Sequence, residues 1–376
     1  MRITLRRLIA TALCLVPLAA CASEEDGILL LPGTGDKPGV MGEVGGEEPS
    51  DDPTPPRRTP TPAPTSSLPE GWDRSLTMAL AVQNPSAIGV DGSNNVYVLS
   101  QPSTPDVQGK PYRLSQFGAF GAFKQQVALE FSFRRMAFSG PDVLLADGTH
   151  LMRLDASMSV IASEVYNLAT RTSPALAVRR TNAGEWLALA GDGTIALRTP
   201  TKNYTLNFAA GEAPISLAFD QTAGLWALGG DTLAYYDPMD SYARTTVSVA
   251  GIGALKDLAP SEVQSEGFCW VLGSAGLARY ALGFDGERIT VARAAAPYAT
   301  AGDRLFVRKG GNAPIVVNDT TGVIQWLDTA GSPLAGSGGL SSATMPGGIA
   351  GAAVDSTANL WVAGKSNHLV GHTRTR

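Results

Sequence analysis

Histidine is the side chain whose chemistry operates near neutral pH, and this sequence has three: His150, His368 and His372. His150 and His368 fall at comparable points of two similar segments, in or just after a turn. An imidazole can act as a general acid, a general base or a metal ligand. Two such rings facing each other would form a shared metal or acid–base site. Two rings solvated in separate turns would do no chemistry, and the sequence leaves both arrangements open.

Other residues suited to catalysis are sparse. Cys269 is the only cysteine after residue 21, and it lies beside Trp270 in an apolar run, which is typical of a buried structural thiol. The sequence contains no G-x-S-x-G motif, no P-loop and no zinc-ligand spacing. We therefore predict no catalytic residue, no metal ligand and no cofactor. A divalent metal is the alternative, and enzymatic activity is the less favoured hypothesis.

The elements that position these residues repeat along the chain. Residues 214–237 contain three short apolar runs separated by turns, and residues 244–250 supply a fourth. This pattern predicts a four-stranded antiparallel meander. Six further segments share it at intervals of 40 to 48 residues, which is the period of a propeller blade. The residues that end the first strand of each copy are Asp91, Ser139, Arg179, Asp220, Ser261, Arg308 and Asp355.

Two copies carry the clearest version of the motif. Residues 88–91 (IGVD) with 95–98 (NVYV), and residues 352–355 (AAVD) with 359–362 (NLWV), resemble blades of NHL-repeat and gluconolactonase-like propellers. The resemblance implies an all-β fold, a seven-bladed β-propeller of four-stranded antiparallel blades, with a six-bladed ring as the alternative. Gluconolactonase-like enzymes hold a divalent metal over the axis with Glu, Asp and Asn side chains. The strand-ending residues here are three Asp, two Ser and two Arg, so we expect the Asp side chains to cap turns instead.

Two further features concern packing and ring closure. An aromatic residue recurs on the second strand and is expected to fill the space between blades: Tyr97, Trp186, Trp226, Trp270 and Trp361. Six repeats are followed by an outer strand, the weakest of them at residues 333–336. The seventh is not, and residues 75–82 (SLTMALAV) precede the first blade without a partner. We expect residues 75–82 to complete the last blade and to close the ring.

The N-terminal part of the chain has a different composition. Residues 1–20 read as a signal peptide, with Arg2, Arg6 and Arg7 before a short apolar core. Residues 18–21 (LAAC) resemble the lipobox of bacterial lipoproteins, which implies a lipid on Cys21. Residues 21–72 are acidic and rich in Pro and Thr, as expected of a disordered tether. Residues 73–376 would then form the propeller. The resemblance implies an exported protein anchored to a bacterial membrane, with sorting typical of the outer membrane.

Charge narrows the possible partners. The net charge is −5, and almost none of it falls on residues 73–376. A near-neutral propeller lacks the basic face that nucleic acid requires, so we expect no nucleic-acid partner. Three functions stay open: a tethered binding propeller with a protein or glycan partner in the cell envelope, a metal-dependent lactonase or lyase, and a structural envelope lipoprotein. The tether favours the first.

One loop stands out as a candidate contact surface. The turn between the second and third strands is short in most copies but covers residues 101–111 (QPSTPDVQGKP) in the first. Long loops in compact repeats commonly carry function, although a neutral insertion is the alternative. We expect this loop and the matching turns of other copies to form a binding face. Its candidate residues are Gln101, Asp106, Lys110, Asp147, His150, Asp319, Asn367 and His368.

Overall fold

The computed structural model describes residues 77–79, 82–106, 108–165, 175–208, 212–263, 266–307, 312–334, 342–345, 347–366 and 368–372. All of them lie in the compact unit Thr65–Arg376. The proposed signal peptide, Cys21 and the tether lie outside the described residues. Within those residues the fold is all-β apart from one short 3-10 turn at Pro238–Asp240. No helix among them is long and apolar enough to cross a membrane.

The described strands pair into seven four-stranded antiparallel sheets, which we call blades 1 to 7. Each blade runs from an inner first strand to an outer fourth strand. Blade 1 contains β2 (Pro85–Val90), β3 (Val96–Ser100), β4 (Tyr112–Phe117) and β5 (Phe123–Leu129). Blade 2 contains β6 (Arg135–Ser139), β7 (Asp142–Ala146), β8 (His150–Leu154) and β9 (Val160–Val165). Blade 3 contains β10 (Leu176–Thr181), β11 (Gly184–Ala190), β12 (Thr194–Arg198) and β13 (Asn203–Asn207).

The remaining blades follow the same order along the chain. Blade 4 contains β14 (Ser216–Phe219), β15 (Leu225–Gly229), β16 (Thr232–Asp237) and β17 (Ala243–Ser248). Blade 5 contains β18 (Leu255–Pro260), β19 (Phe268–Gly273), β20 (Leu277–Phe284) and β21 (Ile289–Arg293). Blade 6 contains β22 (Arg304–Val307), β23 (Pro314–Val317), β24 (Val323–Trp326) and β25 (Ser342–Thr344). Blade 7 contains β26 (Ile349–Val354), β27 (Leu360–Gly364), β28 (His368–His372) and β1 (Thr77–Ala79).

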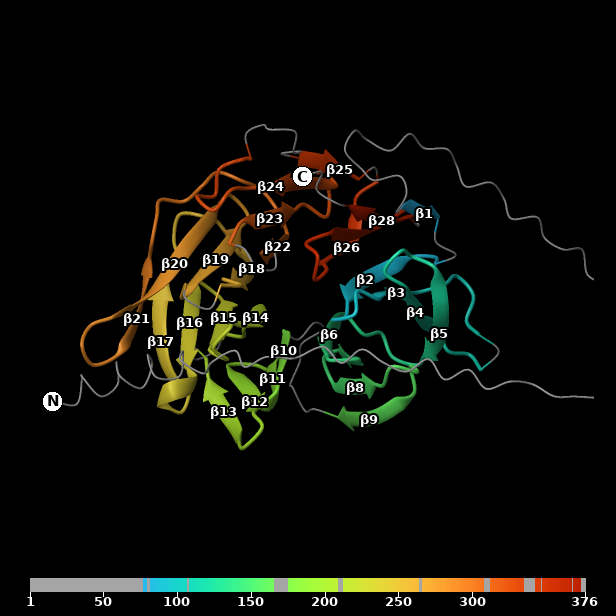
Figure 1. Ribbon diagram of the computed structural model, residues 1–376, viewed down its shortest axis with the longest axis horizontal. Coiled ribbons are helices and arrows are strands. Elements are labelled where there is room, and N and C mark those ends of the chain that lie inside the picture. Colours follow the sequence, from blue (N-terminus) through green and yellow to red (C-terminus); the bar gives the residue numbers. More distant parts are fainter. Residues whose placement is uncertain are drawn as a thin grey trace, which may run out of the picture. The chain divides into compact units, whose positions relative to one another are not determined.

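The inner strands form a closed ring. Each inner strand contacts the inner strand of the next blade, and β26 of blade 7 contacts β2 of blade 1. Figure 1 shows the blades following one another in sequence order, from blue through green and yellow to red. The prediction of an all-β propeller with four-stranded antiparallel blades is therefore confirmed.

The ring is closed by the strand that precedes the first blade. β1 pairs with β28, with Thr77 opposite Val370 and Ala79 opposite His368. The predicted pairing of residues 75–82 with the last blade is confirmed over the three residues of β1. Because the first and last described strands share one sheet, blade 7 has all four strands.

The aromatic residues of the second strands fill the space between blades, and one of them is less deeply buried than the others. Tyr97, Trp226, Trp270 and Trp361 are almost completely buried. Each lies opposite a small residue of the inner strand: Gly89, Ala218, Ala259 and Ala353. Trp186 instead lies opposite Arg179 and is only partly buried. Trp186 nevertheless packs against the core cluster that blades 3 and 4 share.

The Asp residues that end the first strands cap the turns that follow, as predicted. Asp91 Oδ1 accepts hydrogen bonds from the backbone N–H groups of Ser93 and Asn95, both at 2.8 Å. Asp220 does the same for two backbone N–H groups of its own turn. Asp355 also accepts a 2.9 Å hydrogen bond from Trp361 Nε1, which satisfies a buried indole N–H. Arg308 lies outside the described residues.

One predicted strand is wrong. Residues 333–336 were expected to form the outer strand of the sixth repeat, but β24 pairs with β25 instead. Pro333 makes only an isolated bridge with Leu327. Proline has no N–H to donate to a strand ladder. Leu334 N–H donates to the Trp326 carbonyl, and residues 335 and 336 lie outside the described residues.

Candidate functional site

The long loop between β3 and β4 has a fixed tip. Asp106 Oδ1 accepts hydrogen bonds from the backbone N–H groups of Gln108 (2.9 Å) and Lys110 (2.8 Å). The Asp106 N–H in turn donates to the Lys110 carbonyl at 3.1 Å. Gly109 has a φ of 77°, a conformation that favours glycine. The tip is therefore a defined turn; Val107 lies outside the described residues.

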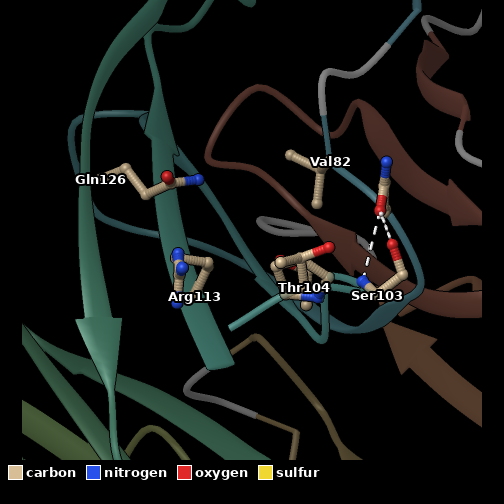
Figure 2. Close-up of a pocket in the computed structure, with 8 residues that line it drawn as sticks. Val82, Ser103, Thr104, Arg113 and Gln126 are labelled. Atoms are coloured by element: carbon tan, nitrogen blue, oxygen red, sulfur yellow. Dashed lines mark hydrogen bonds between the residues drawn. The ribbon is translucent and has the colours of Figure 1, made fainter. Parts of the chain in front are cut away.

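The first half of the loop is held by the segment that leads into β2. Gln83 Oε1 accepts hydrogen bonds from the N–H of Ser103 (3.3 Å) and from its hydroxyl (2.9 Å), as Figure 2 shows. Asn84 Nδ2 donates to the Gln101 carbonyl, and the Gln101 N–H donates to the Asn84 carbonyl, both at 3.1 Å. These bonds join residues about 20 positions apart, so the loop is anchored at its base as well as at its tip.

The anchored loop covers a cavity of about 310 Å³ on blade 1. Most of its lining side chains carry hydrogen-bonding groups: Val82, Gln83, Ser100, Pro102, Ser103, Thr104, Arg113 and Gln126. In Figure 2 Thr104 and Ser103 lie on the loop, and Arg113 and Gln126 lie on two adjacent strands. Arg113 Nη1 donates to the carbonyls of Lys110 (2.8 Å) and Tyr112 (2.9 Å). The strand thus fixes the guanidinium beside the cavity.

This lining suits binding more than catalysis. Hydroxyl, amide and guanidinium groups can donate to or accept from a polar ligand, such as a peptide backbone or a sugar. The cavity lining contains no histidine, cysteine or carboxylate, so it offers no pair of a nucleophile and its base. Its volume is at the lower end of small-molecule sites, which span roughly 300–1,000 Å³.

The other candidate residues are bonded within their own blades. Asp147 accepts hydrogen bonds from the N–H groups of Thr149 and His150, both at 2.6 Å, and contacts His150 Nδ1 at 3.1 Å. Burial would raise the pKa of Asp147, but these hydrogen bonds and His150 outweigh it, so its pKa is lowered. The His150 ring also stacks on Phe131, with ring centroids 4.0 Å apart. His150 is thus a packed turn residue.

Asp319 is held by an arginine of its own blade. Arg304 Nε lies 2.9 Å from both carboxylate oxygens of Asp319. Asn367 lies outside the described residues. For His368 only the backbone is described, in β28, so an approach of the His150 and His368 rings is untested. Gln101, Asp106 and Lys110 of the candidate face do lie on one loop beside the cavity.

Within the described residues, no three or more His, Cys, Asp or Glu side chains are grouped so as to hold a metal ion. Cys269 is buried, and burial raises the pKa of its thiol well above the usual range. A neutral buried thiol is a poor nucleophile. This agrees with its interpretation as a structural residue.

Sequence reasoning did not identify the side chains that line the central channel. A cavity of about 380 Å³ is lined by side chains of six inner strands, most of them apolar. A second cavity of about 440 Å³ lies at the end of the channel that carries the Asp caps, with Glu262 on its wall. The alternation of apolar residues along the first strands was the available signal. It marks burial, but it does not show which side chains face the axis.

Comparison with known proteins supports the fold alone. No protein-family model matches the sequence, and no curated protein matches it. Among solved structures, the chain is similar to virginiamycin B lyase from Staphylococcus aureus, with 12% identity, a TM-score of 0.57, and coverage of 79% of this chain and 98% of that one. Hydrazine synthase from Kuenenia stuttgartiensis gives 10% identity, a TM-score of 0.56, and coverage of 81% and 99%.

A third similar structure is BamB from Moraxella catarrhalis, with 15% identity, a TM-score of 0.51, and coverage of 77% of this chain and 86% of that one. These proteins bear different functions on one kind of architecture. Similarity at this identity therefore identifies the β-propeller and carries no activity over to this chain.

Proposed function

We propose that this chain is an exported, lipid-anchored bacterial protein whose β-propeller binds a protein or glycan of the cell envelope through the β3–β4 loop. The observation that carries the proposal is the anchored loop and its polar cavity. The base of the loop is hydrogen-bonded to Gln83 and Asn84, and the tip of the loop is closed by Asp106. A loop held at two points loses little conformational freedom on binding, which favours affinity.

The N-terminal sequence supports the anchoring part of the proposal. Residues 18–21 resemble a lipobox, and residues 21–72 have the composition of a tether. An anchor of this kind would hold the propeller near a membrane, in our proposal the outer membrane. A propeller on a long tether presents its β3–β4 loop to partners in the envelope.

The lining of the loop cavity supports a binding role over the alternatives. The cavity offers hydrogen-bond donors and acceptors without an acid–base pair. A metal-dependent lactonase or lyase would need a ligand set, and none has been placed at this loop. A structural lipoprotein would have no use for a shaped polar cavity.

The test uses two variants of the loop face. In the first, an Asp-Gly turn replaces residues 101–111. In the second, Thr104→Trp fills the cavity and leaves the loop length unchanged. Thr329→Trp, an exposed turn residue of blade 6, is the matched control for an added surface tryptophan. Circular dichroism first establishes that each variant folds.

Each folded protein is then used to capture partners from envelope extract. We expect the two loop variants to recover about one tenth or less of the wild-type partner, because central contacts commonly contribute 2 kcal/mol or more. The Thr329→Trp protein should recover the wild-type amount. Undiminished capture by both loop variants would show that the partner binds elsewhere.

A further inference from the structure

A ring of seven residues surrounds one end of the channel. Each residue lies near the start of an inner strand and pairs with a residue near the end of the second strand of the same blade. The β3–β4 loop lies at this same end of the propeller. We call these residues the upper ring. They are Ala87, Arg135, Ala175, Ser216, Asp257, Arg304 and Gly351.

Two of the three charged members of the upper ring form hydrogen bonds with residues of the channel wall. Asp257 accepts hydrogen bonds from the Ser216 hydroxyl (2.7 Å) and from the N–H of Leu305 (2.9 Å). Arg304 contacts both oxygens of Asp319 and donates to the Ala350 carbonyl at 3.0 Å. The charge of Arg304 is therefore paired with a carboxylate. Asp257 is held by two neutral donors, and the opposite charge that acts on it is that of Arg135.

The third charged member, Arg135, has no such partner. Among the described residues, none forms a hydrogen bond or an ion pair with its guanidinium. Its charge interacts with Asp257 and Arg304, which lie three and four blades further round the ring. Because Asp257 and Arg304 lie across the ring, we place the Arg135 side chain toward the axis. The upper ring carries small residues at Ala87, Ala175 and Gly351.

Protein atoms surround Arg135 closely, but its side chain remains accessible to water. Burial lowers the pKa of the guanidinium; the charge of Asp257 opposes this shift, and the charge of Arg304 adds to it. An arginine stays protonated under these conditions. A cation in such a confined place interacts with an anion more strongly than a cation on an open surface does.

The wall of the channel next to this charge is apolar apart from Glu262. Met136 and Leu305, which directly follow Arg135 and Arg304, line the 380 Å³ cavity. Phe138, Leu258, Phe306 and Val354 also line it. One charged end and one apolar chamber thus lie next to each other along the axis.

We propose that the channel binds an amphipathic monocarboxylate, with the carboxylate on Arg135 and the apolar part in the chamber. A guanidinium forms two parallel hydrogen bonds to a carboxylate. Burial of a hydrocarbon chain against the chamber wall adds free energy in proportion to the area removed from water. The site is separate from the loop cavity, so this inference holds or fails independently of the proposed function.

The test is a titration of the purified protein, followed by calorimetry. Three probes are compared: decanoate below its micelle concentration, 1-decanol as the uncharged chain, and acetate as the head group alone. Decanoate should bind at least about tenfold more tightly than either control compound.

Two variants then locate the contact. Arg135→Gln should weaken decanoate binding about tenfold or more, because a charge-assisted pair is lost. Arg134→Gln removes the same charge from the neighbouring exposed residue and should leave affinity unchanged. Arg135→Lys should give an intermediate affinity, since lysine keeps the positive charge but cannot form the two parallel hydrogen bonds of a guanidinium.

Several results would overturn the proposal. They are no binding of decanoate, equal binding of decanoate and decanol by the wild-type protein, or full affinity in a folded Arg135→Gln protein. The comparison of decanoate with decanol needs no variant, so the proposal can be refuted even if Arg135→Gln does not fold.

Discussion

Asp355 shows how one side chain serves a turn and a core at once. It accepts hydrogen bonds from the backbone of its turn, from the Asn359 amide and from buried Trp361. Burial would raise its pKa, but the bonds from Trp361, Asn359 and Thr357 outweigh it, and its pKa is lowered. A carboxylate with a lowered pKa contributes stability above its unfolded-state pKa, near 3.9, that is lost as pH falls through the folded-state value.

We therefore predict a pH-dependent effect of Asp355→Asn. At pH 7 the variant should lose about 1–3 kcal/mol of unfolding free energy, because buried donors lose a charged acceptor. Between about pH 5 and pH 2 the wild-type protein should lose this advantage, so the two stabilities converge. Urea unfolding at several pH values measures both curves. Asp328→Asn, which removes a cap without a buried indole partner, should cost less; parallel curves for Asp355→Asn and wild type would contradict the account.

In blade 4 a different pair of residues surrounds the capping carboxylate of the turn. Asn95 and Asn359 donate to the caps of blades 1 and 7, but Gly224 stands at this point in blade 4. A Cβ on Gly224 would lie 2.2 Å from the Tyr235 hydroxyl and 2.6 Å from Asp220 Oδ2. The tyrosine hydroxyl thus occupies the place of the asparagine amide. Burial, with the charge of Asp220 next in effect, raises the pKa of Tyr235 far above its usual value.

This close approach makes Gly224→Ala a sharp test. The added methyl group has to displace buried Tyr235, so we expect a loss of about 1–3 kcal/mol in unfolding free energy. Gly92→Ala is the control, because no heavy atom lies within 4 Å of a Cβ there. Chemical denaturation of the two variants gives the comparison. Equal stabilities would mean that blade 4 readjusts without cost.

At the scale of elements, the β1–β28 pair is the contact that holds the ends of the propeller together. β1 adds three residues to blade 7. The chain then passes through buried Val82, which packs in one cluster with Ile88, Val98 and Trp361. The clasp therefore combines strand pairing with core burial at the junction of blades 7 and 1.

Removal of the clasp should destabilise the whole ring. We expect a protein that begins at residue 83 to lose about 2–4 kcal/mol relative to one that begins at residue 74, because both a strand and the Val82 side chain are lost. Thermal unfolding of the two truncated proteins measures the difference. If their melting temperatures agree, β1 does not close the ring in solution.

At the scale of the whole molecule, a closed propeller leaves its ends, loops and channel as the places for function. The strand edges inside the ring are paired or covered by neighbouring blades, so no long open edge is left there for another chain. The loop cavity and the upper ring lie at the same end of the channel, where the turns between second and third strands are found. In our proposal, the anchored propeller uses this end for contact with other molecules.

The proposed anchor depends on a single thiol. We predict that Cys21→Ser abolishes acylation and releases the protein from the membrane, because stable anchoring needs the lipid chains. Metabolic labelling with a fatty acid, followed by membrane fractionation, measures both effects. Cys269→Ser serves as the control, because that thiol is buried in the propeller. Label retained by the Cys21→Ser protein would end the lipoprotein hypothesis.

The repeat pattern was enough to predict the blade, because its signals are local. A strand alternates over a few residues, a turn is capped within four positions, as at Asp91, and an aromatic residue marks the buried second strand, as at Trp226. The spare strand at residues 77–79 and the long loop were visible for the same reason. Local reasoning fails where an alternative of similar local quality exists: the sequence pattern around Pro333 favours an outer strand, but residues 342–344 form it.

Only the tertiary structure decided which side chains meet. Arg135, Asp257 and Arg304 lie 122 and 47 residues apart along the chain, and nothing in their neighbourhoods connects them. They share the upper ring because the inner strands close around one axis. The pairing of Asp319, a residue of the candidate face, with Arg304 follows from strand register in the same way. Convergence of this kind depends on the angles between blades, which a linear pattern does not contain.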